Sequence, residues 1–534
     1  MTIQPVLIAG QWRESRSVGT FQAVNPRTKE KLPELYPISS WDDVESALES
    51  ACAAARQLRT LGSDRIAAFL DRYAEGIEGR RDELVELAAL ETALAKTPRL
   101  AGAELPRTTS QLRQAATAAR LGSWAHATID TASGIRSCYE SLGPVCVFGP
   151  NNFPFAFGSI SGGDFAAALA AGNPVIAKAN SSHPGTTRLF AQVAQQVASD
   201  VGLPPGTIQL LYRTGHAEGE RMVSDHRVGA TGYTGSRQAG LKLKAAADAG
   251  GKPIYLELSS VNPVIILPGA IAERAGAIAD EFSASCLMGT GQFCTNPGMV
   301  LLIAGEATEA WIAAVADRFA KAPVGTLLSP AVASSLTASL QALQAAGAVI
   351  VVGGPAAGEP ATGEGYRCAN TLLRVCAETF FAHPEELQTE AFGNASLLVV
   401  ASDVDQAVRV LEHLEGNLTG CIYSHSGGAD DAAYDRLASL LVTRVGRLLN
   451  DKMPTGVAVS PAMNHGGPYP ATGHPGFTAV GIPASLLRFA KLTCYDQVRA
   501  HRLPRLLQDA NPTGQTWRSI DGQWTQAAVG AARA

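Results

Sequence analysis

Apolar and polar positions divide the chain into stretches of different period. Residues 1 to about 40 are polar and rich in turns, with short strand-like pieces. From residue 41 to about 120, apolar residues recur with the period of amphipathic helices. One helical face collects Ala47, Ala51, Ala54 and Ala55, and another collects Ile66, Leu70, Tyr73 and Ile77. This stretch is therefore predicted to be a series of helices.

From residue 145 onward, short apolar runs alternate with helical stretches. The predicted strands are 145–148, 174–178, 207–211, 228–233 and 253–258, and the predicted helices include 165–171 and 186–201. Gly172 follows the first of these helices and is a residue type that ends helices in the left-handed conformation. This order of strands and helices predicts a parallel, doubly wound α/β sheet, and such sheets bind ligands beyond the carboxyl ends of their strands.

A second alternating series covers 259–485, with strands expected at 348–353, 395–401 and 420–423 and a helix at 309–320. We therefore expect two α/β domains, one formed by 1–121 and 141–258 and the other by 259–485. A length of 534 residues also requires more than one hydrophobic core. Two segments, 122–140 and 486–510, lie outside these domains. Residues 511–534 are expected to form a C-terminal tail with a frayed, alanine-rich end.

Composition and charge narrow the functional classes. The net charge of −5 gives no electrostatic reason to expect nucleic acid or an anionic membrane as a partner. Residues 1–5 lack the basic and apolar regions of a signal peptide, and no apolar run reaches the length of a membrane span. None of the nine cysteines forms a CxxC pair, and histidine does not accompany them at ligand spacing. We therefore expect a cytoplasmic protein with no disulfide framework and no metal site.

The most informative cysteine is Cys294, which lies between Gly291 and Gly298 and just before an apolar run at 299–303. Glycines on both sides predict a tight loop, and the apolar run predicts a buried strand. A thiol on a stiff loop beside the core is how a nucleophile is presented to a substrate. The alternative is an inert buried thiol, and the loop taken alone favours that interpretation.

Three polar residues lie at or near predicted strand ends. Asn152, between Pro150 and Pro154, could direct its amide N–H at a developing oxyanion, although Asn beside Pro usually marks only a turn. Lys178 ends a strand, where it could bond ribose hydroxyls or phosphate or could simply extend to solvent. Glu257 lies inside an apolar strand, where burial would raise its pKa toward general-base range unless it pairs with a basic residue.

Two further stretches are suggestive but weak. The turn at 234–240 opens a predicted helix, so its amide N–H groups and the helix dipole could bind an anion. It matches neither GxGxxG nor GxxxxGK[ST], and a plain N-cap by Ser or Thr accounts for it equally well. The stretch 390–393 places a carboxylate and an aromatic ring at a strand entrance and alone indicates almost nothing.

Taken together and in this order, these residues resemble the landmarks of the aldehyde dehydrogenase superfamily. The matching positions are 150–154, Lys178, 234–236, 256–258, 291–294 and 390–393, and the likeness runs from about residue 5 to about residue 510. The resemblance implies a Rossmann-type cofactor domain, a second α/β catalytic domain and a small β oligomerisation arm formed by 122–140 and 486–510. Stretches such as 182–186, 453–457 and 465–472 resemble the branch that contains 2,5-dioxovalerate (α-ketoglutaric semialdehyde) dehydrogenases and a bacterial fatty-aldehyde dehydrogenase.

The resemblance also implies a role for each landmark. The Cys294 thiolate would attack the aldehyde carbon, and the Asn152 amide with the Cys294 backbone N–H would hold the oxyanion. After hydride transfer to nicotinamide, Glu257 would activate water to hydrolyse the thioester. Lys178 and Glu390 would hold the two riboses. The other expected cofactor contacts are Phe148, Pro150, Asn151, Ser181, Gly235, Ser236 at the pyrophosphate, Arg237, and Phe392 beside the nicotinamide. Phe155 and Phe293 are expected to contact the substrate.

One departure from many relatives concerns the cofactor. NAD-preferring relatives place an acid three residues after the strand lysine, where this chain has Ser181. Without a carboxylate to bond the 2′-hydroxyl and repel a phosphate, NADP should be accepted, with NAD also possible. Arg237 could pair with the 2′-phosphate or be a solvated surface residue.

The branch resemblance favours oxidation of 2,5-dioxovalerate to 2-oxoglutarate. Such a substrate requires a cation near the tunnel mouth. By the resemblance, Arg107 lies on a helix that flanks the tunnel and is the candidate to bind the distal carboxylate; a salt bridge to Glu104 or another acid is the alternative.

Three other functions remain to be weighed. A coenzyme-A-acylating relative usually lacks the base at Glu257, and a long-chain aldehyde dehydrogenase would need an apolar tunnel. A non-catalytic structural relative is disfavoured by the presence of Cys294, Asn152 and Glu257. The resemblance further implies a homodimer or homotetramer.

Overall fold

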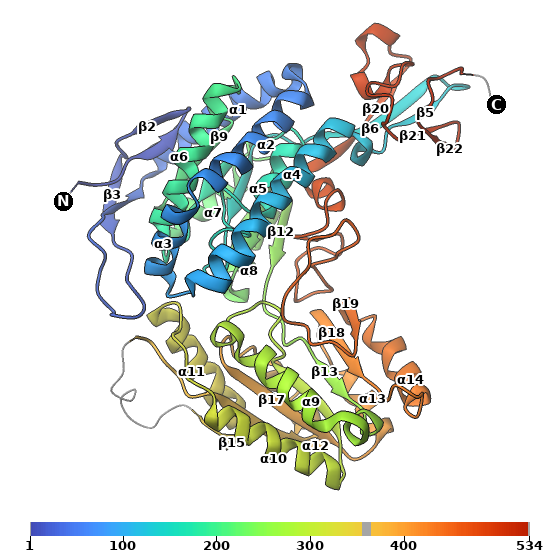
Figure 1. Cartoon of the computed structure of the whole chain (residues 1–534). Helices are drawn as coiled ribbons and strands as arrows, with labels where there is room; N and C mark the ends of the chain where they lie inside the picture. Colours follow the sequence, from blue (N-terminus) through green and yellow to red (C-terminus); the bar gives the residue numbers. More distant parts are fainter. Residues whose placement is uncertain (1, 355–364, 532–534) are drawn as a thin grey trace.

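The computed structural model describes residues 2–354 and 365–531 (Figure 1). Within these residues, two seven-stranded sheets and a five-stranded sheet organise the chain. The first large sheet and its helices occupy the upper left of Figure 1, the second large sheet lies below, and the five-stranded sheet projects as an arm at the upper right. The expected α/β class, with a β arm, is confirmed.

The first sheet has the strand order β12–β11–β7–β8–β9–β1–β2. Its parallel strands are β7 (Val145–Phe148), β8 (Val175–Lys178), β9 (Ile208–Leu211), β11 (Ala230–Thr234) and β12 (Ile254–Glu257), followed by antiparallel β1 (Val6–Ile8) and β2 (Gln11–Arg13). The register pairs Phe148 with Lys178 and Thr234 with Glu257. The carboxyl ends of these strands therefore meet along one edge, which carries several of the predicted site residues.

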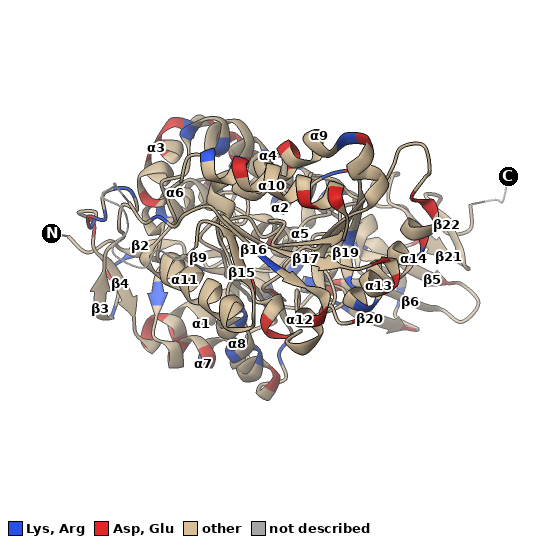
Figure 2. Cartoon of the chain, turned by 90° about the horizontal axis from the view of Figure 1, so that it is seen from below, with Lys and Arg blue, Asp and Glu red and all other residues tan. Residues whose placement is uncertain are grey.

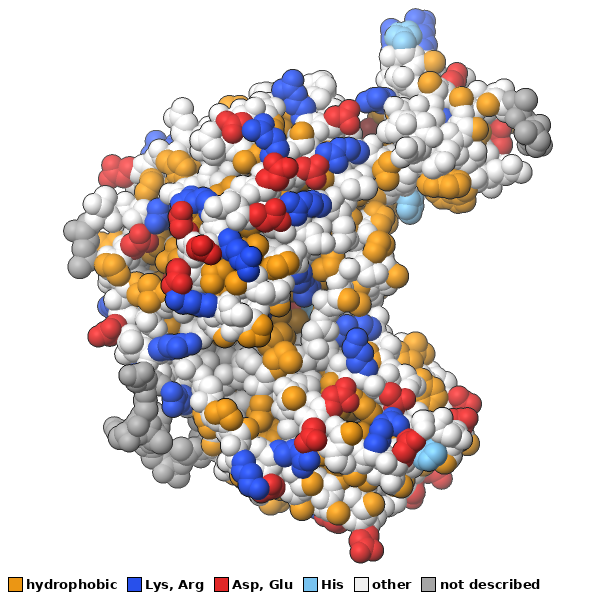
Figure 3. All heavy atoms as spheres, viewed as in Figure 1, with side chains coloured by type: hydrophobic (Ala, Val, Ile, Leu, Met, Phe, Trp, Pro, Cys, Tyr) orange, Lys and Arg blue, Asp and Glu red, His pale blue; other side chains and the backbone are white. Residues whose placement is uncertain are grey.

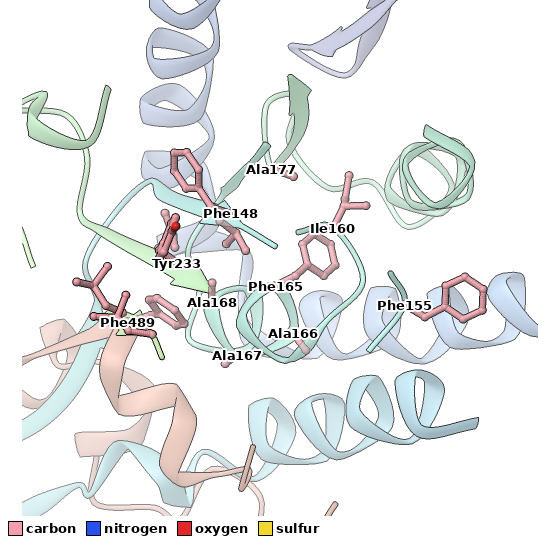
Figure 4. Packing of buried hydrophobic residues seen from close by; sticks show 14 of the residues in the cluster. Phe148, Phe155, Ile160, Phe165, Ala166, Ala167, Ala168, Ala177, Tyr233 and Phe489 are labelled. Carbon is pink, nitrogen blue, oxygen red and sulfur yellow. The ribbon is translucent and has the colours of Figure 1, made fainter. Parts of the chain in front are cut away.

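Helices cover this sheet on both faces. They are α1 (Trp41–Leu61), α2 (Ser63–Gly79), α3 (Arg81–Thr92), α4 (Leu105–Leu121), α5 (Gly163–Ala170), α6 (Pro184–Asp200), α7 (His216–Ser224) and α8 (Arg237–Ala249), with a π-helical turn η1 (Lys96–Glu104) before α4. The small alanines of α5 let this helix lie close to the sheet, and Phe165 packs its ring against Phe69 and Tyr73 of α2 (Figure 4). Gly172, with φ of +88°, follows α5 in the left-handed region, as the sequence predicts.

The second sheet has the order β15–β16–β17–β14–β13–β18–β19, with all strands parallel except β15. Its strands are β13 (Val264–Ile266), β14 (Met299–Ile303), β15 (Val349–Val352), β16 (Thr371–Cys376), β17 (Ala395–Ala401), β18 (Asn417–Tyr423) and β19 (Val445–Asn450). Its helices are α9 (Pro268–Leu287), α10 (Glu306–Lys321), α11 (Pro330–Ala345), α12 (Ala377–Ala382), α13 (Val404–Glu412) and α14 (Asp431–Leu441). The chain passes from the first sheet to the second near residue 258, where the sequence predicts a domain boundary.

The arm sheet contains two strands that the sequence analysis did not predict. Its order is β20–β6–β5–β21–β22, with β5 (Thr128–Asp130), β6 (Ile135–Ser141), β20 (Ala490–Asp496), β21 (Arg518–Ile520) and β22 (Gln523–Thr525). The last two lie within 511–534, so the arm sheet extends beyond the bounds 122–140 and 486–510 that were expected for it. The wholly buried side chain of Arg518 explains why this segment folds against the arm. Its guanidinium donates to the carbonyl oxygens of Gln508, Asp509 and Ala527 at 2.6, 3.1 and 2.9 Å.

Smaller features complete the chain. A three-stranded sheet joins β3 (Ser17–Phe21), β4 (Tyr36–Ser39) and β10 (Arg213–Thr214). All nine cysteines are free thiols. Among the described residues, none of the helices combines the length and the apolar character that a bilayer span requires. Basic and acidic residues are interspersed along the helices seen from below (Figure 2).

Candidate active site

The candidate site lies where the carboxyl edge of the first sheet faces the amino edge of the second. Glu257 ends β12 of the first sheet. From the second sheet, Cys294 precedes β14 and Glu390 precedes β17, while Asn417 begins β18. Because loops before parallel strands share one edge of a sheet, residues distant in the sequence converge here.

Two asparagines fix the loop that carries Cys294. Asn262 adopts the left-handed conformation, with φ of +48°, and its Nδ2 donates to the carbonyl oxygen of Cys294 at 2.9 Å. The side-chain oxygen of Asn417 accepts the N–H of Asn262 at 3.1 Å. Gly291 has φ of +67°, and a Cβ there would lie 2.0 Å from the carbonyl oxygen of Gly393. The backbone around the half-buried Cys294 is therefore held on both sides, and Gly291 accepts no side chain.

A histidine that the sequence analysis did not single out lies between the predicted nucleophile and the predicted base. His465 Nε2 is 3.4 Å from Cys294 Sγ and 3.0 Å from Glu257 Oε1. Both His465 and Glu257 are almost fully buried. Burial alone would lower the pKa of His465, but the charges of Glu257 and Cys294 outweigh it and raise that pKa to about 10. Glu257 therefore pairs with a histidine rather than with a lysine or arginine.

The amide of Asn152 lies against the cysteine loop. Its Nδ2 donates to the carbonyl oxygen of Gln292, two residues before Cys294, at 3.0 Å. Its own carbonyl oxygen accepts Arg99 Nη2 at 2.9 Å. The structure thus brings Cys294, Asn152 and Glu257 to one place, and it adds His465 to them.

A cavity of about 500 Å³ opens at the carboxyl edge of the first sheet. Its walls include seven of the predicted cofactor residues: Phe148, Pro150, Asn151, Lys178, Ser181, Gly235 and Ser236. Burial, together with the charge of nearby Arg213, lowers the pKa of Lys178 to about 8. Ser236 accepts the N–H of Ala239 at 3.4 Å, so it also serves as the N-cap of α8. The cavity suits a dinucleotide because strand ends, a helix N-terminus and basic side chains face it together.

Glu390 and Phe392 do not line this cavity. The carboxylate of Glu390 accepts hydrogen bonds from the hydroxyl of Ser259 and the N–H of Ser260 and lies near Glu257, and burial raises its pKa to about 7. Phe392 is half-buried and packs against the main core.

Arg237 is engaged elsewhere. Its guanidinium donates to both carboxylate oxygens of Glu415, at 2.9 and 3.2 Å, and it is absent from the cavity wall. Its side chain is 39% exposed in this ion pair, which agrees better with the predicted surface residue than with a 2′-phosphate contact. In the described part of the chain, the arginine on the wall is Arg213, which begins β10 two residues after the end of β9. Its place after a parallel strand was the feature of the sequence that could have identified it.

Another cavity, of about 960 Å³, adjoins the cysteine loop and is lined by Phe293, Phe153, Arg99 and Arg107 among others. The predicted alternative for Arg107 is not observed, because Glu104 pairs with Arg99 at 2.7 Å. Arg107 donates to Gln111 at 3.4 Å, and its buried Nη2 has no partner among the described residues. Burial lowers the pKa of Arg107. This buried cation is therefore available to an anionic ligand.

The expectation that Phe155 contacts substrate is not met. Its side chain is fully buried, with the ring centroid 5.2 Å from that of Phe190 of α6, and it belongs to the main core (Figure 4). Glu104 accepts the backbone N–H of Phe155 at 2.8 Å and fixes it there. Phe153 instead presents its ring to the cavity, 5.4 Å from the ring of Phe293.

Comparisons with known proteins agree with this arrangement. A model described as "Aldehyde dehydrogenase family" matches residues 12–461. Alpha-ketoglutaric semialdehyde dehydrogenase 2 of Azospirillum brasilense is 39% identical over 524 residues, covering 96% of this chain and 98% of that protein. Alpha-ketoglutaric semialdehyde dehydrogenase of Acinetobacter baylyi is 34% identical over 531 residues, covering 97% and 98%.

Solved structures share the fold at lower identity. Aldehyde dehydrogenase C from Pseudomonas syringae, solved with NAD+ and octanal, superposes with a TM-score of 0.79 at 22% identity over 92% of this chain and 96% of that one. A lactaldehyde dehydrogenase gives 0.78 at 22% identity, covering 92% and 98%.

Proposed function

Because this chain belongs to the aldehyde dehydrogenase family, we propose that it oxidises 2,5-dioxovalerate to 2-oxoglutarate with NADP. The family assignment makes the chain an NAD(P)-dependent oxidoreductase that acts on aldehydes. The observation that carries the choice of substrate is Arg107 on the wall of the cavity beside the cysteine loop, a half-buried residue whose buried Nη2 has no hydrogen-bond partner among the described residues. A buried charge without a partner is costly, so a carboxylate-bearing aldehyde would relieve that cost on binding. Two relatives that cover almost the whole chain are named for this semialdehyde.

The proposed chemistry follows from the side chains around Cys294. The Cys294 sulfur attacks the aldehyde carbon, while His465 Nε2, 3.4 Å away, holds the thiol proton and is itself oriented by Glu257. The second N–H of the Asn152 amide and the Cys294 backbone N–H stabilise the oxyanion. A nicotinamide bound in the neighbouring cavity supplies the hydride acceptor. Glu257 then activates water against the thioester, with its second carboxylate oxygen buried and unpaired among the described residues.

The substrate proposal is tested by Arg107→Met. The change should lower kcat/KM for 2,5-dioxovalerate about 10- to 100-fold, because one charge-assisted contact is lost. For pentanal, an uncharged aldehyde of the same chain length, kcat/KM should stay within about 3-fold, because that substrate makes no such contact. Steady-state kinetics on both substrates measure this.

The matched control is Arg113→Met. Arg113 lies on the same helix but pairs with Glu78 near the surface at 2.6 and 2.7 Å, so neither substrate should be affected. Equal losses on both aldehydes in Arg107→Met would argue against carboxylate recognition. They would favour the alternative, an aliphatic aldehyde dehydrogenase, whose preference a series from acetaldehyde to dodecanal would reveal.

The cofactor proposal is supported by three residues on the 500 Å³ cavity: Ser181 leaves room for a phosphate, and Arg213 and Lys242 supply positive charge. Arg213→Leu should lower kcat/KM for NADP about 10- to 100-fold and leave NAD within about 3-fold. Arg221→Leu is the control, because Arg221 lies over the ring of Trp41 at 3.6 Å. A wild-type enzyme with a strong NAD preference would refute NADP use.

Self-association through the arm is part of the same proposal. Exposed apolar side chains gather on its strands and loops, namely Ile135, Leu492, Val498, Trp517 and Trp524. The space-filling outline is hollowed between the arm and the second α/β part (Figure 3). A second copy of the chain could cover these side chains.

A further inference from the structure

Three ligand atoms of different chemistry meet at the candidate site. Cys294 Sγ, His465 Nε2 and one carboxylate oxygen of Glu257 all lie within 4.8 Å of one another. Sulfur to nitrogen is 3.4 Å, and nitrogen to oxygen is 3.0 Å. In a tetrahedral zinc site the bond lengths place ligand atoms about 3.2–3.8 Å apart. Of the three distances between these ligand atoms, sulfur to nitrogen therefore lies within the range for zinc, and nitrogen to oxygen is slightly shorter than it.

One proton on His465 cannot make good hydrogen bonds to both of its neighbours in this cluster. Nε2 can carry a single hydrogen, yet both Sγ and Oε1 face it, so good alignment with one leaves the other poorly bonded. The other carboxylate oxygen of Glu257 is buried and has no hydrogen-bond partner in the described residues. A divalent cation on the Nε2 lone pair would contact sulfur, nitrogen and carboxylate at once.

We infer that Cys294, His465 and Glu257 form an inhibitory zinc-binding site. A thiolate, an imidazole and a carboxylate are all zinc ligands, and three protein ligands leave a fourth position for water. The thiolate and the carboxylate together balance the charge of the ion. Arg107 and Arg447 lie near enough to interact with the charge of Cys294, and they oppose the ion. Zinc bound there occupies the sulfur lone pair, so the enzyme cannot attack an aldehyde.

The test measures binding independently of turnover. Zinc-free full-length protein is equilibrated with zinc by dialysis, and protein-bound metal is quantified. Wild-type protein should bind one equivalent that Cys294→Ala and His465→Ala both lose. Cys376→Ser is the matched control, because this exposed thiol lies outside the site and its loss should leave the equivalent in place. Cobalt in place of zinc should show a thiolate-to-metal charge-transfer band that Cys294→Ala abolishes.

Each outcome bears on the inference. Absence of stoichiometric metal from wild-type protein, or its retention in Cys294→Ala, would overturn it, as would a cobalt complex without the thiolate band. If His465→Ala fails to fold, Cys294→Ala still decides, because it removes only a half-buried sulfur atom. Activity should fall on adding zinc and return with a chelator. The metal-free enzyme's oxidation of 2,5-dioxovalerate is measured separately, so either proposal can fail without the other.

Discussion

The surroundings of a single side chain set its chemistry, and Lys178 illustrates this at the cofactor cavity. Its ammonium group is buried beside Arg213 and lies 5.9 Å from the ring centroid of Phe148. Burial and the like charge of Arg213 both disfavour the protonated form, so the pKa falls from its usual value to about 8. Lys178 is therefore a cation below that pH and is neutral above it.

This gives a pH prediction for cofactor binding. As pH rises from about 7 to about 9.5, KM for NADP should rise at least about 3-fold, because the cationic form that attracts the cofactor disappears. Steady-state kinetics at saturating aldehyde measure it, and Lys178→Met should flatten the profile. A wild-type KM that stays level across this range would show that Lys178 keeps its proton or does not contact the cofactor.

At the same scale, the sequence indicated side-chain roles but not side-chain partners. Cys294, Asn152, Glu257 and Lys178 could be picked out because glycines, prolines or apolar strands surround each of them. The neighbour of Glu257, His465, is 208 positions away, and no local pattern records that contact. Arg237 was proposed as a 2′-phosphate contact for a similar reason, since its pairing with Glu415 joins the start of α8 to a loop 178 positions away.

Among the elements, α6 shows how one helix can depend on another. Its N-cap residue, His183, provides no side-chain cap. Glu91, at the end of α3, caps α6 instead. Its carboxylate accepts the N–H groups of Gly185 and Thr186 at 2.8 Å each and the Thr186 hydroxyl at 2.7 Å. The start of α6 is thereby tied to α3.

Glu91→Ala should therefore lower the free energy of unfolding by about 3 kcal/mol, because two buried N–H groups lose their acceptor. Denaturant unfolding followed by circular dichroism would measure the free energy of the first unfolding transition in each variant. Glu86→Ala on the same helix is the control, since that side chain is exposed and pairs only with Lys96 among the described residues. Equal midpoints for the two variants would mean that water replaces the carboxylate.

Strands and helices of the first sheet followed from periodicity, because each is a short apolar run or an amphipathic stretch. The position of the candidate site at the second sheet did not follow from periodicity. Its residues precede the strands, so the rule that ligands lie at carboxyl ends holds for only one of the two sheets. β21 and β22 were missed because they are three residues each and depend on the buried Arg518 rather than on an apolar pattern.

At the scale of the whole molecule, the arm stands away from both α/β parts (Figure 1). Leu492 on β20 is 60% exposed, and Trp524 on β22 is 55% exposed. Apolar surface of this kind on a projecting sheet supports the proposed contact with a second copy of the chain. The resemblance to the aldehyde dehydrogenase superfamily implied an arm at 122–140 and 486–510, but it could not predict the number of subunits.

Leu492→Asp should weaken self-association, because a carboxylate buried at an apolar contact costs several kcal/mol. Light scattering coupled to size exclusion would then report a smaller mass at low micromolar protein. Leu90→Asp is the control: Leu90 is 43% exposed on α3, away from the arm. A mass that matches wild type in Leu492→Asp would place the contact elsewhere.

The residues of the candidate site come from both sides of residue 258, and this has a consequence for protein engineering. The carboxylate of Glu257 closes the first half of the chain, whereas the sulfur of Cys294 and the imidazole of His465 belong to the second. A chimaera joined at this position would keep both seven-stranded sheets intact, whereas the arm sheet would take β5 and β6 from one parent and β20, β21 and β22 from the other. It would likewise take Glu257 from one parent and Cys294 from the other. The turnover of such hybrids would report how closely the two parents agree on the spacing of these few atoms.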